Sequence, residues 1–114
     1  MRVFTRVMKA LSDPNRVKIL KMLQHRPLCV CEMQAVLKIA QPTVSSHLKV
    51  LEDADLVCSR KEGLWVIYSL ADGKSSPYCA TLLGNLTHWL EDDPEIAGIV
   101  KTLPFINREE ICRK

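Results

Sequence analysis

Two cysteine thiols separated by one residue are the most reactive feature of this sequence. Cys29 and Cys31 flank Val30 and are followed by the acidic Glu32. Thiolates are soft ligands for thiophilic ions, and a thiolate at a helix N-terminus is stabilised by the helix dipole. We therefore predict that the pair binds a soft metal or metalloid ion. The alternative is that both are small buried apolar side chains, as free cysteines often are.

The spacing of the two thiols has a mechanical consequence. We expect a helix over residues about 29–38, with Val30 facing the core. Residues i and i+2 of a regular helix point about 200° apart. One ion therefore reaches both Cys29 and Cys31 only if the first turn unwinds, and the distortion then passes to the next helix, on which this one packs.

Length, composition and charge limit the class of protein. The chain has 114 residues, 47% of them hydrophobic and 25% charged, with a net charge of +3. These are the values of one globular domain, too short to include a separate cofactor domain. No apolar run is long enough to span a membrane, and the charged N-terminus lacks a signal peptide. Five cysteines, an odd number, argue against a disulfide framework. We expect a cytoplasmic protein without a membrane partner.

Hydrophobic periodicity predicts a mainly α fold with a β-hairpin, an α+β chain of five main helices. We expect Asp13 to be the N-cap of the second helix and Pro14 to be its first residue. We expect residues 1–92 to form a DNA-binding and dimerisation domain, and residues 93–114 to form an extension with a short helix and a cysteine-bearing tail. The predicted helices are 3–11, 14–24, 29–38, 42–54 and 77–92, and the strands are 56–60 and 64–70 around a tip at 61–63.

The fourth helix has a face suited to DNA. Its core side is Val44, Leu48 and Leu51, and its other side is small and rich in hydroxyls. Two short helices, a tight turn and a basic hairpin make a winged helix-turn-helix. The alternative is a solvated helix of a small bundle. The predicted contacts to double-stranded DNA are Gln41, Thr43, Ser45, Ser46, His47, Lys49, Arg60 and Lys61.

Three segments resemble the ArsR/SmtB family of metalloregulatory repressors. They are residues 13–20, the helix 41–51, and the hairpin with its segments 56–57, 61–63 and 65–68. The resemblance covers residues 3 to about 92 and departs at Asp55, where the family commonly has Gly. It implies a transcriptional repressor, not an enzyme, that forms a homodimer through its first and last helices. It also implies that the protein leaves its operator DNA when metal binds.

Cys29-Val30-Cys31 before an acidic residue resembles the ligand motif of the family's arsenic-sensing branch. This implies that trivalent arsenic or antimony is the inducer, with no organic cofactor. That branch often has a third cysteine three residues after the pair, where this chain has Gln34. The third metal ligand is then expected to be Cys112, in the tail. Cys58 and Cys79 are expected to be structural.

Other possible functions are supported by fewer residues of the sequence. The zinc-sensing branch uses Asp and His early in the last helix and then His-x-x-Glu, and this chain has only the second half, His88 and Glu91. A thiol oxidoreductase needs Cys-x-x-Cys in a strand-helix unit, which is missing. A thiol redox-sensing repressor of the same fold, in which Cys29 or Cys31 forms a disulfide, remains an alternative.

Overall fold

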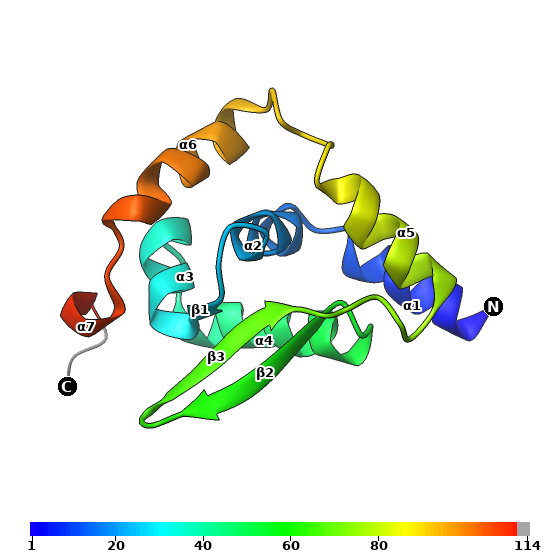
Figure 1. Ribbon diagram of the computed structural model, residues 1–114, viewed down its shortest axis with the longest axis horizontal. Coiled ribbons are helices and arrows are strands. Elements are labelled where there is room, and N and C mark those ends of the chain that lie inside the picture. Colours follow the sequence, from blue (N-terminus) through cyan, green and yellow to red (C-terminus); the bar gives the residue numbers. More distant parts are fainter. Residues whose placement is uncertain (112–114) are drawn as a thin grey trace.

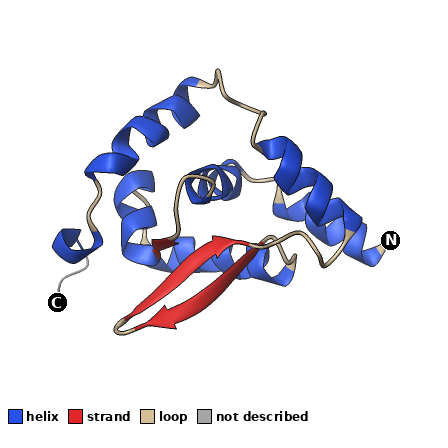
Figure 2. Cartoon of the chain, viewed as in Figure 1, coloured by secondary structure: helices blue, strands red, loops and turns tan. Residues whose placement is uncertain are grey.

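The computed structural model describes residues 1–111 as helices around one small antiparallel sheet (Figures 1 and 2). This confirms the predicted fold class, and α6 corresponds to the short helix expected after residue 92. Within this range no helix is long and apolar enough to cross a membrane. The elements are α1 (Arg2–Ala10), α2 (Pro14–Leu23), β1 (Leu28–Cys29), α3 (Val30–Leu37), α4 (Gln41–Asp53), β2 (Val57–Glu62), β3 (Trp65–Leu70), α5 (Pro77–Leu86), α6 (Pro94–Thr102), a 3-10 turn η1 (Leu103–Phe105) and α7 (Arg108–Ile111).

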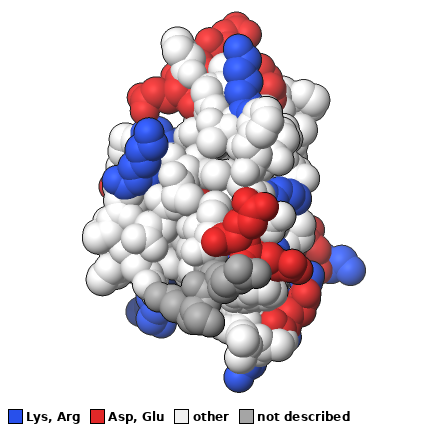
Figure 3. Space-filling model, turned by 90° about the vertical axis from the view of Figure 1, so that its left-hand side faces the viewer, with Lys and Arg blue, Asp and Glu red and all other residues white. Residues whose placement is uncertain are grey.

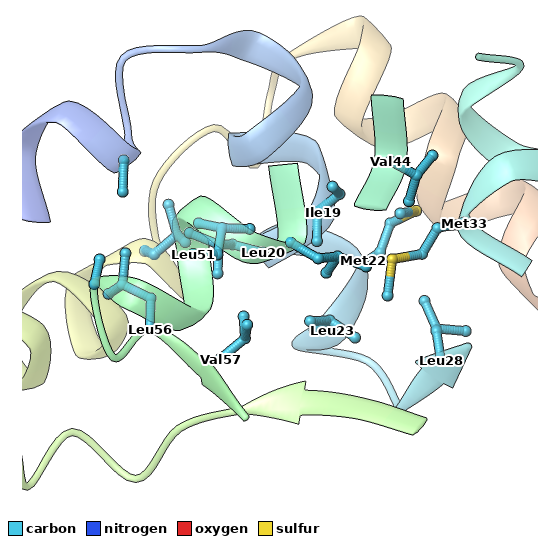
Figure 4. Close-up of a cluster of buried hydrophobic side chains, with 14 of the residues drawn as sticks. Ile19, Leu20, Met22, Leu23, Leu28, Met33, Val44, Leu51, Leu56 and Val57 are labelled. Carbon is cyan, nitrogen blue, oxygen red and sulfur yellow. The ribbon is translucent and has the colours of Figure 1, made fainter. Parts of the chain in front are cut away.

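Helix α2 lies at the centre of the molecule, with α3 and α6 toward one end and α1 and α5 side by side at the other (Figure 1). The main core fills the space between α2, α3, α4 and the sheet (Figure 4). Val44, Leu48 and Leu51 are fully buried there, as the periodicity of α4 predicts. Each such side chain contributes roughly 2 kcal/mol of hydrophobic free energy, so α4 is fixed firmly on α2.

The sheet has the strand order β1-β3-β2, with both pairs antiparallel. Glu62 pairs with Trp65, which leaves Gly63 and Leu64 as a two-residue turn. Gly63 has a φ of +60°, a conformation that glycine adopts without strain and that tight hairpins require. The predicted tip at residues 61–63 is therefore shifted, because Lys61 and Glu62 still belong to β2.

The start of the third helix differs from the prediction. Cys29 is not helical: its backbone is extended, with φ −95° and ψ 171°, and α3 begins at Val30. Leu28 and Cys29 form β1, opposite Tyr68 and Ile67 of β3. Local periodicity could not reveal this strand, because its hydrogen-bonding partner lies about forty residues further along the chain.

Polar groups fix the junction of α1 and α2. Asp13 caps α2 as predicted, accepting a hydrogen bond from Asn15 N–H at 2.8 Å. Burial raises the pKa of the Asp13 carboxyl, but the N–H groups of Asn15 and Arg16 outweigh burial and leave the pKa lowered. Arg16 donates to the carbonyls of Ala10 and Lys9, the last residues of α1. The segment that resembles the family therefore ties two helix ends together.

Helix α5 ends at Leu86, not near residue 92 as predicted, because a buried lysine binds the end of the helix. Lys21 of α2 is 2% exposed, and its Nζ donates to the carbonyls of Leu86 and Trp89, each at 2.9 Å. It also pairs with Glu91. Leu90 follows with a φ of +63°, a strained conformation for a branched side chain. The charged hydrogen bonds of Lys21 help to hold this turn.

We expect Lys21→Met to lower the free energy of unfolding by about 2 kcal/mol, because the buried Leu86 carbonyl loses its charged donor. The measurement is the urea midpoint at a fixed protein concentration. Lys18→Met is the matched control, since among residues 1–111 Lys18 forms an ion pair only with the exposed Glu95. Equal midpoint shifts in the two variants would refute this role of Lys21.

Candidate functional site

Most of the predicted DNA-contacting residues of α4 point outward. Gln41, Thr43, Ser45, Ser46 and Lys49 are all exposed, and small side chains allow a helix to approach base edges closely. The Lys49 ammonium lies 3.4 Å from the Asp53 carboxylate, one turn further along the helix. This exposed pair is weak, so it leaves Lys49 available to a phosphate.

His47 lies apart from this exposed face. Its side chain is 13% exposed, with Nε2 3.8 Å from the Asp13 carboxylate and Nδ1 3.3 Å from an Arg16 guanidinium nitrogen. The imidazole thus packs α4 against the start of α2. This position suits a residue that orients the helix, although it was predicted as a DNA contact.

The β2–β3 hairpin supplies the predicted basic wing. Arg60 and Lys61 are exposed on β2, and Arg60 Nε lies 2.6 Å from the Glu62 carboxylate. Ser59 donates to Glu52 of α4 at 3.2 Å, which links the hairpin to α4. Leu64 at the tip is 97% exposed. The end of the molecule that carries α6 and α7 shows both acidic and basic side chains, scattered over a mostly uncharged surface (Figure 3).

The predicted thiol pair lies in a small cluster of its own, against the half of β3 that is nearer the hairpin tip. Cys29 and Ile67 are buried in it, and Cys31 and Trp65 are partly buried against them. We call these four residues the thiol cluster. Because Cys29 precedes the helix, the 200° separation expected for a regular helix does not apply. The prediction that the first helical turn must unwind is therefore wrong in its premise. The cluster also joins the thiols directly to β3, a connection that sequence reasoning missed.

A buried carboxylate lies directly behind the thiols. Glu32 is 1% exposed, and its oxygens accept hydrogen bonds from Cys29 N–H at 2.9 Å, Arg26 at 2.9 Å and Arg108 at 3.1 Å. Burial raises the pKa of the Glu32 carboxyl, but the Cys29 N–H and the two guanidinium groups outweigh burial, so the pKa is lowered. Glu32 is therefore an anion shared by three segments of the chain. An acidic residue three positions after an N-cap is the local signal that could have indicated it.

Arg108 joins the C-terminal segment to the thiol cluster. Besides its bond to Glu32, its guanidinium carbon lies 5.5 Å from the centre of the Trp65 ring, a cation–π distance. Burial lowers the pKa of Arg108, but hydrogen bonding and charge from Glu32, with smaller contributions from Cys29, leave the pKa raised. Helix α7 accordingly packs beside α3 (Figure 1). Nothing local in the sequence pairs residue 108 with residue 32.

The other candidate metal ligands lie away from the thiol pair or outside the described residues. Cys112 lies outside the described residues. Cys79 is buried and donates to the Ala54 carbonyl at 3.2 Å, whereas Cys58 is exposed on β2, 3.5 Å from the Ser69 hydroxyl. Glu91 pairs with Lys21. Within residues 1–111 no group of three or more His, Cys, Asp or Glu side chains is arranged to hold a metal ion. The described residues thus offer one soft pair, Cys29 and Cys31.

Comparison with known proteins places this geometry among bacterial regulators. A family model described as "Bacterial regulatory protein, arsR family" matches residues 13–59. The chain is 44% identical over 69 residues to an uncharacterized HTH-type transcriptional regulator of Methanocaldococcus jannaschii, spanning 60% of this chain and 78% of that protein. It is 34% identical over 73 residues to the arsenical resistance operon repressor of Bacillus subtilis, spanning 63% and 70% of the two chains.

Solved structures of regulators have a fold similar to that of this chain. HlyU from Vibrio cholerae matches with a TM-score of 0.66 and 30% identity, over 81% of this chain and 95% of that one. The homodimeric winged helix-turn-helix DNA-binding domain Mb0332 from Mycobacterium bovis matches with a TM-score of 0.64 and 26% identity, over 81% of each chain.

We expect Glu32→Ala to lower the free energy of unfolding by about 3 kcal/mol, because the guanidinium groups of Arg26 and Arg108 lose the anion that they share. Urea denaturation at a fixed protein concentration measures the change. Glu62→Ala is the control, since it breaks only the exposed pair with Arg60. A Glu32→Ala midpoint as close to wild type as that of the control would show that the buried carboxylate is not a structural anchor.

Proposed function

Because this chain belongs to the arsR family of bacterial regulatory proteins, and because its thiol pair adjoins the wing, we propose that it is a metalloid-responsive transcriptional repressor. It binds operator DNA as a homodimer and dissociates when trivalent arsenic or antimony binds Cys29 and Cys31. Members of this family are DNA-binding regulators, so the expectation that the chain is not an enzyme is confirmed. We propose the cytoplasm as its location, since its target is DNA.

The exposed face of α4 and the wing support DNA binding. Two copies of α4 in a symmetric dimer reach successive major grooves, roughly 34 Å apart. Gln41 at the start of α4 can pair bidentately with adenine, and the hydroxyls of Thr43, Ser45 and Ser46 can contact bases or phosphates. Lys49 and Lys61 would displace counterions, so the affinity should fall steeply as salt rises.

Helices α1 and α5 support dimerisation. Their packing brings Phe4 and Tyr78 into an edge-to-face contact with ring centres 5.2 Å apart, and both rings are still partly exposed. Trp89, after α5, is 46% exposed. Val7 and Leu86 of these helices are buried inside the subunit. We propose that the exposed aromatic residues form the contact with a second copy. Residues 1–92 would then carry DNA binding and dimerisation, with residues 93–114 as an extension.

The observation that carries the inducer proposal is the thiol cluster. Cys29 pairs with Ile67 across β1 and β3, and Trp65 begins β3. A metalloid bound to both thiols changes the packing against the half of β3 that is nearer the tip of the wing. The same ligand acts on the first turn of α3, which packs on α4. One binding event therefore reaches both of the proposed DNA-contacting elements.

Trivalent arsenic suits this site chemically. In neutral As(OH)3, each As–S bond that forms replaces an As–OH bond, and the thiol proton leaves with that hydroxide as water. Two such steps give a neutral complex with the cysteine pair. The alternative, a disulfide-based redox sensor, needs an oxidant instead, and the two differ in whether induction survives strong reductant.

We expect Ser46→Glu to reduce operator affinity at least 100-fold, because it places a negative charge on the exposed face of α4 against DNA phosphates. Binding is measured by fluorescence anisotropy with operator DNA at two salt concentrations. Thr102→Glu adds the same charge on α6, where the Thr102 hydroxyl donates only to Gly98 of its own helix. Normal binding by Ser46→Glu, with a normal circular dichroism spectrum, would show that α4 does not read the DNA.

We expect Cys29→Ser and Cys31→Ser to bind operator DNA normally and to lose release by arsenite, because a hydroxyl is a poor ligand for a soft ion. Cys58→Ser and Cys79→Ser are the controls and should respond like wild type. Arsenite titrations of the protein–operator complex, made in excess reductant, give the result. Wild-type release of the Cys29→Ser protein would end the thiol-sensing proposal, and a wild-type response found only without reductant would favour the redox alternative.

A further inference from the structure

We propose that the polar face of α1 binds the phosphate backbone of DNA, beside the major groove that α4 enters. Three cations form this face, Arg2, Arg6 and Lys9, and we call them the basic face. The inference rests on the proposed DNA binding and adds to it a phosphate-contacting surface outside α4 and the wing. Its ligand is the anionic backbone of duplex DNA, whatever the base sequence.

Spacing places the three cations on one side of α1. Arg2 and Arg6 are four residues apart and Lys9 follows three residues later, so the side chains lie one above another along the helix. All three are exposed. The other side of α1 carries Phe4, whose ring contacts Tyr78 of α5. The basic face therefore points away from the surface that we propose for dimerisation.

This arrangement of charge does not stabilise the helix itself. Like charges three or four residues apart repel one another on a helix surface, and Arg2 begins the helix, where the helix dipole favours anions. Helix α1 contains no acidic residue. Among residues 1–111, no ion pair involves Arg2, Arg6 or Lys9. An anion bound from outside the protein would relieve this repulsion.

A groove joins the basic face to the outward side of α4. It is lined by Arg2, Thr5, Arg6 and Lys9 of α1 and by Val50 and Asp53 of α4. An Arg6 guanidinium nitrogen lies 3.5 Å from the Asp53 carbonyl oxygen, a long contact that holds the arginine weakly. Asp53 lies one turn after Lys49 and two turns after Ser46 on α4. The basic face therefore begins where the proposed DNA-contacting side of α4 ends.

The charge of this groove suits a phosphate. Its lining has three cationic side chains and one carboxylate, that of Asp53. The Asp53 carboxylate already pairs with the Lys49 ammonium at 3.4 Å. The cations of α1 are therefore not neutralised by the acidic residue beside them, and the groove keeps an excess of positive charge.

The dimensions of α4 also fit a backbone contact at this place. Seven residues separate Ser46 from Asp53, which is about 10 Å along a helix axis. The major groove of DNA is about 12 Å wide, and a recognition helix contacts base edges with its N-terminal residues. When Ser46 faces the bases, the C-terminal end of α4 and the adjoining basic face therefore lie near the phosphates that border the groove.

The salt dependence of DNA binding tests the proposal, because it reports the number of phosphate contacts. We expect Arg6→Gln to lower DNA affinity about tenfold and to reduce the slope of log affinity against log salt concentration by about 2, since each contact contributes about 0.9 and a dimer loses two. Operator DNA and a duplex of unrelated sequence should lose the same factor, because phosphate contacts do not distinguish base pairs. Fluorescence anisotropy over a series of salt concentrations measures both quantities.

Two control variants separate a local contact from a general loss of charge. Arg6→Lys keeps the cation and should retain the wild-type slope. Lys101→Gln removes the same charge from an exposed position on α6, toward the other end of the molecule. Its affinity and slope should stay close to those of wild type. Circular dichroism and sedimentation check that each variant is folded and dimeric.

A salt slope of Arg6→Gln equal to that of Lys101→Gln overturns the inference and leaves the proposed function standing. Sedimentation of Arg6→Gln as a monomer also overturns it, because the basic face would then belong to the contact between subunits. Failure of the wild-type protein to bind DNA at all, by contrast, refutes the proposed function itself.

Discussion

The buried Glu32 carboxylate is the interaction on which the end of this molecule that carries the thiol pair depends. A charge removed from water is tolerated only when several donors replace the lost solvent. Here the donors come from the start of α3, from the loop after α2 and from α7. The loop after α2 leads directly into α3, but Arg108 of α7 lies 76 residues from Glu32 in the chain, so the carboxylate, rather than chain connectivity, holds α7 to the other two segments. The thiols lie at this junction, and any ligand that moves Cys29 acts on all three segments.

Helix α4, the proposed DNA-contacting helix, is held mainly by apolar packing instead of by a buried charge. Helix α4 is held by three fully buried apolar side chains, and Asp13, Arg16 and His47 fix its position relative to α1 and α2. Packing of this kind is stiff, because a close-packed core resists small displacements. The hairpin is attached through a side-chain hydrogen bond to α4, through the two residue pairs of β1, and through Val57, Tyr68 and Leu70, which pack in or against the main core. The tip of the hairpin lies outside this core, with Leu64 97% exposed. Under the proposed function, a change at the thiols therefore acts on the tip half of the wing more easily than on α4.

Sequence reasoning reached the features that local patterns determine. The buried stripe of α4 and the Asp13 cap follow from spacing and residue type, and both are confirmed. Sequence reasoning failed at elements whose structure depends on residues far away in the sequence. β1 is a strand only because Tyr68 and Ile67 pair with it, and α5 stops at Leu86 because Lys21 comes from another helix to bind its carbonyls. Arg108 gives no local signal of its contact with Glu32, 76 residues away. The sequence indicated the thiol motif, but it did not indicate that Trp65, Ile67 and Arg108 lie beside the motif.

The unequal exposure of the two thiols would set the order in which they react in the proposed sensor. Cys31 lines a surface groove, whereas Cys29 is 3% exposed in β1, beside β3. A reagent in solution therefore meets Cys31 first, and the second bond waits until β1 separates from its neighbour. Local openings of short, weakly paired strands cost much less free energy than global unfolding, so this delay is set by a fluctuation of the resting protein and not by the concentration of the reagent. A brief encounter with a single thiol can then be reversed before the wing is disturbed, and only a ligand that stays bound through an opening event produces a response.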